Sequence, residues 1–210
     1  MPRLAVFAIT LFASSGAGLA DNVPDVSRAD REAITRAYGP KTAARIFSNE
    51  FAATRADALK KSGANIPGFD CKGDRLSALI EALPYPVSPQ AISWVERYLV
   101  DCEPRSRRNL MLFLEDEKSR AIELLPGETK ADPRLQRQSI VAAKAAAAGA
   151  NPACEKSWVT DTRAIEAYKD ATTPWSENWK FDLCGKSAEV EMSFAPAGAA
   201  GTSFSAKLMK

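Results

Sequence analysis

The sequence predicts an α+β protein in which N-terminal helices precede two related modules, each a helix with an antiparallel β-meander closed by one disulfide. The first observation behind this fold class is a repeated pattern. Trp-x-Glu-x-aromatic occurs at residues 94–98 and again at 175–179, and each copy leads to an aspartate followed by a cysteine. Aromatic residues that recur with a period of two are typical of a strand with one buried face.

The second observation is the spacing of the cysteines. The chain has four, and an even number in an exported protein favours disulfides. Cys71 precedes Cys102 by 31 positions and Cys154 precedes Cys184 by 30, which favours these two pairings over crossed ones. Zinc sites use more closely spaced cysteines, so we expect no metal and no cofactor.

The N-terminus has the features of a signal peptide. Arg3 supplies a positive charge, residues 4–12 are apolar but too few to span a bilayer, and small residues precede a cleavage point before Asp21. No later stretch is apolar enough for a transmembrane segment. We therefore expect the mature chain to be periplasmic or secreted.

Charge and composition exclude several classes of function. The formal net charge of +2 falls to +1 when Arg3 is removed, and such a balance gives no support to nucleic-acid binding. The chain contains no histidine, which excludes Ser-His-Asp and Cys-His catalysis and histidine-ligated metals.

The predicted domains are a signal peptide (1–20), an N-terminal helical segment (21–66), a first module (67–130) and a second module (131–210). In the helical segment, Ser27 caps a helix that ends near Gly39, and apolar residues at helical spacing predict a second helix over 41–61.

The first module begins with a short helix over 74–83, because its leucines share one helical face. Three prolines then exclude regular structure until about residue 91. Strands are expected over 93–101, 110–114 and 121–125, which together form an antiparallel meander.

The second module begins with Asp132 and Pro133, an N-cap followed by proline at the first helical position. This helix ends at Gly149 and is expected to lie across a sheet, although a flexible alanine-rich linker is the alternative. Residues 157–168 are ambiguous between strand and helix. Strands follow over 173–183, around 190–194 and over 204–208.

The repeated pattern also supplies candidate catalytic residues. If the two strands meet, Glu96 and Glu177 could form a carboxylate pair like those of glycoside hydrolases. The favoured interpretation is instead that the aromatic residues fill the core and that each glutamate pairs with an arginine or reaches solvent.

A basic cluster is the second candidate. Arg105, Arg107 and Arg108 follow Cys102 and could bind an acidic polymer, an anionic head group or a partner protein. Together with Trp94 and Trp175, these arginines are the residues expected at a binding surface. A solvated turn without a function is the alternative interpretation.

Several short motifs resemble those of small exported bacterial proteins of unknown function. The first is Trp175-x-Glu177-x-Trp179, followed by Cys184 and Gly185 in a C-terminal hairpin. The runs at 123–127 and 132–136 are similar to segments of the same proteins. The resemblance implies a periplasmic setting and no particular activity.

The function expected from these observations is non-catalytic. We expect an exported envelope accessory or binding protein whose partner is a periplasmic protein or an envelope component. The alternative is a carboxylate-dependent hydrolase of cell-wall glycan that uses Glu96 and Glu177. The sequence predicts neither the ligand nor the oligomeric state.

Overall fold

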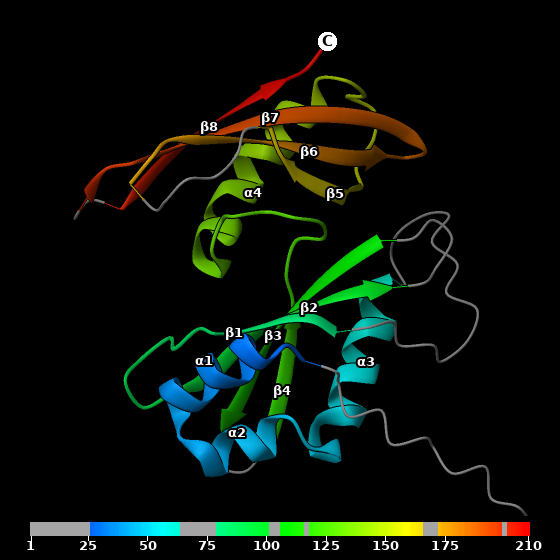
Figure 1. Cartoon of the computed structure of the whole chain (residues 1–210). Coiled ribbons are helices and arrows are strands. Elements are labelled where there is room, and N and C mark those ends of the chain that lie inside the picture. The colour runs from blue at the N-terminus through cyan, green and yellow to red at the C-terminus, as the bar shows by residue number, and fades with distance from the viewer. Residues whose placement is uncertain (1–25, 64–78, 101–105, 116–117, 166–171, 199–200) are drawn as a thin grey trace, which may run out of the picture.

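The protein has an α+β architecture with two antiparallel four-stranded sheets, one above the other in Figure 1. This computed structural model describes residues 26–63, 79–100, 106–115, 118–165, 172–198 and 201–210. The first sheet has the order β1-β2-β3-β4 and the second has the order β5-β6-β7-β8. The coarse fold class predicted from the sequence is therefore confirmed.

The N-terminal helices and the first sheet share one hydrophobic core. The helical elements are α1 (Arg28–Tyr38), α2 (Pro40–Ile46), the short 3-10 helix η1 (Asn49–Phe51) and α3 (Ala52–Gly63). The strands are β1 (Leu79–Pro84), β2 (Ile92–Val100), β3 (Ser106–Glu115) and β4 (Lys118–Glu123). Ile34, Ile46 and Phe51 of the helical region are completely buried together with Trp94 and Leu112 of the sheet. The helical segment therefore packs on the first sheet in one continuous core.

The second core lies between α4 (Pro133–Ala148) and the second sheet. Its strands are β5 (Ser157–Ala164), β6 (Trp175–Leu183), β7 (Lys186–Pro196) and β8 (Thr202–Leu208). The Asp132 side chain caps α4 by accepting hydrogen bonds from the backbone N–H of Arg134 and Leu135. Ala143 and Ala147 are completely buried, so the alanine-rich segment is a packed helix rather than a flexible linker.

Two local predictions need correction or completion. The helix expected over 74–83 is wrong from residue 79 onward, because β1 pairs antiparallel with β2 and buries Leu79 and Ala82; residues 74–78 lie outside the described residues. The ambiguous stretch 157–168 is a strand as far as Ala164. The first meander also has four strands, since β1 joins the three that were predicted.

The predicted Cys154–Cys184 disulfide is confirmed, with the two Cα atoms 5.8 Å apart. Cys184 and Gly185 have φ angles of 56° and 85° and form the two-residue turn of the β6–β7 hairpin. The bridge therefore joins this turn to the segment before β5. Cys71 and Cys102 lie outside the described residues, so their pairing stays a prediction.

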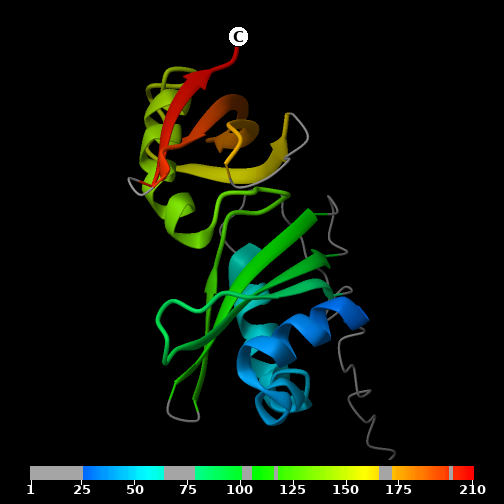
Figure 2. The same ribbon diagram turned by 60° about the vertical axis from the view of Figure 1, so that its left-hand side comes forward.

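Residues 124–132 connect the two halves, which appear as separate layers in the turned view (Figure 2). The Gly127 N–H donates to the Arg107 carbonyl of β3, and the Glu128 N–H donates to the Thr162 carbonyl of β5. The Asn109 side chain also donates to the Gly127 carbonyl, at 3.1 Å. This connection, the crossover, is therefore hydrogen-bonded to both sheets.

Candidate functional site

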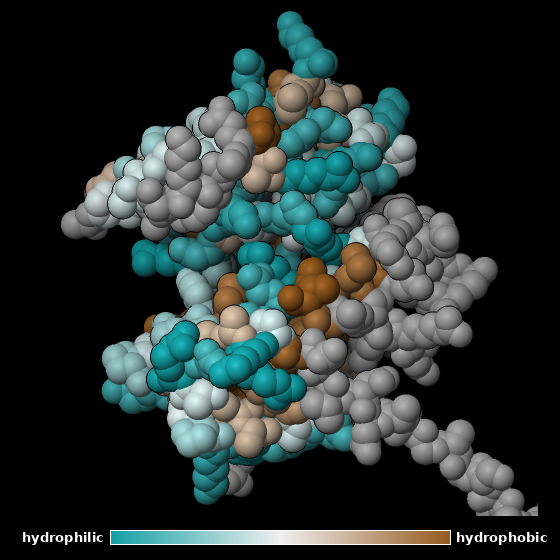
Figure 3. All heavy atoms as spheres, viewed as in Figure 1, coloured by the Kyte–Doolittle hydropathy of each residue, from teal (hydrophilic) through white to brown (hydrophobic). Residues whose placement is uncertain are grey.

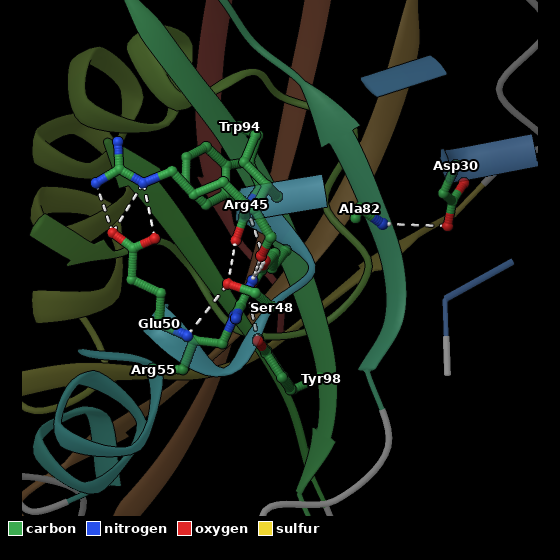
Figure 4. Close-up of polar contacts among 10 residues, drawn as sticks. Asp30, Arg45, Ser48, Glu50, Arg55, Ala82, Trp94 and Tyr98 are labelled. Carbon is green, nitrogen blue, oxygen red and sulfur yellow. Dashed lines mark hydrogen bonds and ion pairs between the residues drawn. The ribbon is translucent and has the colours of Figure 1, made fainter. Parts of the chain in front are cut away.

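Glu96 lies on β2 with its side chain directed into the first core, and none of it is exposed. Its carboxylate accepts hydrogen bonds from Trp94 Nε1 at 2.7 Å and from the Tyr98 hydroxyl. Arg55 of α3 donates to both carboxylate oxygens, from Nε at 2.8 Å and from a terminal nitrogen at 2.6 Å. The repeated pattern therefore places a buried carboxylate between its two aromatic neighbours and one arginine. Figure 4 labels the three donors, Trp94, Tyr98 and Arg55.

The electrostatics of this cluster keep its donors protonated. Burial alone would lower the pKa of Arg55, but the hydrogen bonds and charge of Glu96 outweigh it and raise the pKa. The pKa of Tyr98 is raised well above its ordinary value, first by burial and then by the Glu96 charge. Arg55 also donates to the Ile46 carbonyl at 2.7 Å. The cluster thus joins α2, α3 and β2 by hydrogen bonds.

Glu177 occupies the corresponding place on β6 and is also completely buried. It accepts hydrogen bonds from Trp175 Nε1 at 3.0 Å and from Trp179 Nε1 at 2.8 Å. The backbone N–H groups of Lys130 and Ala131, just before α4, complete the set at 2.7 and 3.3 Å. Here neutral N–H groups take the place of the arginine, and the carboxylate holds the crossover against the second sheet.

These positions contradict a catalytic pair. Glu96 and Glu177 belong to two different cores, and neither side chain reaches an open cleft. Trp94 and Trp175 are 0% and 8% exposed. Trp94 is therefore a core residue, and Trp175 reaches only a small pocket formed with β7 and β8. The favoured interpretation, in which the aromatic residues fill the core, is correct. Glu96 also has the arginine partner that this interpretation expected. For Glu177 the expectation was wrong, because this glutamate is buried and accepts hydrogen bonds from neutral N–H groups.

The predicted arginine cluster is not one exposed patch in the described part of the chain. Arg107 forms a half-exposed ion pair with Glu128 of the crossover. Only 2% of the Arg108 side chain is exposed, and its guanidinium lies 3.7 Å from Glu123. Arg105 lies outside the described residues. Arg107 therefore pairs with the crossover, and Arg108 lies beside the last strand of its own sheet.

A groove lies beside this junction, between the crossover, α4 and the start of β5. Its volume is about 250 Å³, slightly below the usual range for small-molecule sites. The lining residues are Glu123, Leu124, Leu125, Pro126, Pro133, Gln136, Arg137, Ile140, Lys144, Ser157, Trp158 and Val159. The walls are thus mainly apolar, with charged groups from two elements.

Apolar surface is also visible at mid-height, where the halves meet, whereas the upper half is mostly hydrophilic in the same view (Figure 3). Trp158 differs from the other three tryptophans because it is partly exposed and lines the groove.

Sequence reasoning missed this groove, because three separate segments of the chain supply its walls. The one local signal was the apolar run at 124–126 beside a capped helix.

Glu123 supplies the groove with a carboxyl whose pKa is shifted. Partial burial raises this pKa to about 7, and the positive charge of the nearby Arg108 opposes the increase. The side chain is still 42% exposed, so a ligand in the groove can approach it. At neutral pH the Glu123 carboxyl is therefore near the midpoint of its titration.

No group of three or more Cys, Asp or Glu side chains in the described ranges could hold a metal ion. Within the same ranges, no helix has the length and apolar character needed to cross a membrane. Comparisons with protein families, with curated proteins and with solved structures gave no match to this chain.

Proposed function

We propose that this chain is an exported, periplasmic protein that binds an envelope component without catalysing a reaction, and that the groove beside the crossover is its binding surface. The observation that carries this proposal is a contrast in exposure. Glu96 and Glu177 are withdrawn into the cores, whereas Glu123 and Arg137 are exposed and Trp158 is partly exposed in the groove.

The proposal includes two related modules. The repeated glutamate lies on the second strand of both sheets. On the neighbouring first strands, Ala82 pairs with Glu96 and Ala164 pairs with Glu177. Each first strand also contains a register shift. This correspondence supports a duplicated unit in which one carboxylate fastens a preceding segment to its sheet.

Two observations support export. The first 20 residues have the charge, the apolar run and the small residues of a signal peptide. The Cys154–Cys184 disulfide is typical of an oxidising compartment such as the periplasm.

Export is tested by expressing the full chain in a Gram-negative host and measuring the intact mass of the protein in the periplasmic fraction. We expect a chain that begins at Asp21. A chain that keeps residues 1–20 and stays in the cytoplasm would contradict the export proposal.

Binding is tested by native mass spectrometry of protein purified gently from the periplasm. We expect an additional mass on the wild type that is absent from an Arg137→Glu/Lys144→Glu variant. The control is Arg134→Glu/Lys207→Glu, which makes the same charge change at exposed positions outside the groove. Loss of the additional mass in both variants, or its absence from the wild type, would refute the groove as the binding surface.

A further inference from the structure

The charges of the groove are unevenly distributed between its walls. Arg137, Ile140 and Lys144 recur at helical spacing on the side of α4 that lines the groove. This wall therefore presents two cations with an apolar residue between them. The rest of the lining includes Glu123, the apolar crossover residues and the start of β5.

The groups around Glu123 favour an anion over a cation. Arg108 of β3 lies 3.7 Å from Glu123, and Arg108 in turn interacts with Asp161 of β5. Together with Arg137 and Lys144, these groups carry a net charge of +1 when Glu123 is ionised and +2 when it is protonated. A positive field surrounded by apolar walls attracts an anion that also has an apolar part.

We propose that the groove binds a small amphipathic anion, with its acidic head at Arg137 and Lys144 and a short apolar tail between Ile140, Trp158 and the crossover. This inference depends on the proposed binding function and adds the chemical class of the ligand. The volume of about 250 Å³ limits the tail to a short chain or a single ring.

Glu123 makes this binding depend on pH. Its pKa is about 7, so lowering the pH from 8 to 6 removes a negative charge from the groove. Repulsion of the ligand's head then disappears, and the affinity for an anion rises as the pH falls. Because 42% of the Glu123 side chain is exposed, water screens this effect, and we expect a change of about two- to fivefold.

The test uses two probes with the same tail and opposite permanent charges, octanesulfonate and octyltrimethylammonium. Each is titrated into the mature protein, with calorimetry for the affinity and tryptophan emission as the site-specific signal. We expect octanesulfonate to bind about tenfold more tightly than the cation. The emission change should disappear in Trp158→Phe, because the other tryptophans are buried.

Matched variants locate the binding. Arg137→Gln/Lys144→Gln should weaken octanesulfonate about tenfold, and the exposed control Arg134→Gln/Lys207→Gln should not change it. Glu123→Gln should make the affinity independent of pH, at the value of the wild type near pH 6. Equal affinity for the two probes, an unaffected Arg137→Gln/Lys144→Gln variant, or a pH dependence that persists in Glu123→Gln would each overturn the proposal.

The two proposals can fail separately. A groove-dependent additional mass on the periplasmic protein, combined with no preference for octanesulfonate, would refute the ligand class and leave the binding function standing. No additional mass and no probe binding would refute both.

Discussion

Replacing Glu96 by glutamine tests the structural role of the repeated carboxylate. The substitution keeps the size of the side chain and removes its charge, which leaves the Arg55 guanidinium buried without a counter-ion. The Arg55 and Glu96 side chains are 4% and 0% exposed, so water cannot compensate. Removing one partner of a buried pair costs about 3–5 kcal/mol, a large part of the roughly 5–15 kcal/mol that stabilises a typical domain.

The assay is urea unfolding followed by near-UV circular dichroism and by tryptophan emission. With a slope of about 2 kcal/mol per molar urea, the midpoint of Glu96→Gln should fall by about 2 M. Glu177→Gln is the matched variant, because it makes the same change on the second strand of the other sheet. Its donors are neutral N–H groups, so we expect a smaller loss of about 1.5–3 kcal/mol.

A double variant separates the ion pair from general damage to the core. Arg55→Met/Glu96→Gln removes both charges, so it should be less destabilised than the sum of the two single variants. If Glu96→Gln lowers the free energy of unfolding by less than about 1 kcal/mol, the carboxylate does not fasten α3 to the sheet.

Three further predictions concern the crossover, the disulfide and the cap of α4. In thermal unfolding, Gly127→Ala should destabilise the protein by about 2–3 kcal/mol more than Gly185→Ala. The two glycines have nearly the same φ, 88° and 85°, so the backbone strain is matched. Only at Gly127 would the added Cβ collide with backbone, at 2.4 Å from Thr162. Equal losses would mean that the crossover does not pack closely on β5. Replacing Cys154 and Cys184 by serine should cost about 4 kcal/mol of unfolding free energy, because the bridge closes a 30-residue loop; an unchanged midpoint would contradict this. Asp132→Ala should lower the free energy of unfolding by about 1 kcal/mol, because it removes the N-terminal cap of α4. If calorimetry shows no loss of stability, packing alone determines where α4 begins.

Local chemistry explains which elements were predictable. Asp132 and Pro133 mark the start of α4 and Gly149 marks its end, and the structure keeps these boundaries. The strict alternation along β6 and β7 likewise matches one buried and one more accessible face. In these segments, capping and periodicity agree with the tertiary packing, so one sequence is sufficient.

Long-range pairing explains what the sequence could not predict. The leucines and isoleucine of 74–83 fit a helical face, but pairing with β2 makes residues 79–84 a strand. Arg55 lies four residues from both Phe51 and Leu59, on the apolar face of the helical segment. Its partner Glu96 is 41 positions away, and no local pattern connects the two. The groove combines the crossover, α4 and β5, and no local pattern brings these three segments together.

A peptide map of the protein under non-reducing conditions gives the sharpest test of two related modules. We expect one linked peptide pair containing Cys71 and Cys102 and a second containing Cys154 and Cys184. A crossed link, such as Cys71 to Cys184, or free thiols at Cys71 and Cys102, would contradict two related modules that are each closed by their own bridge.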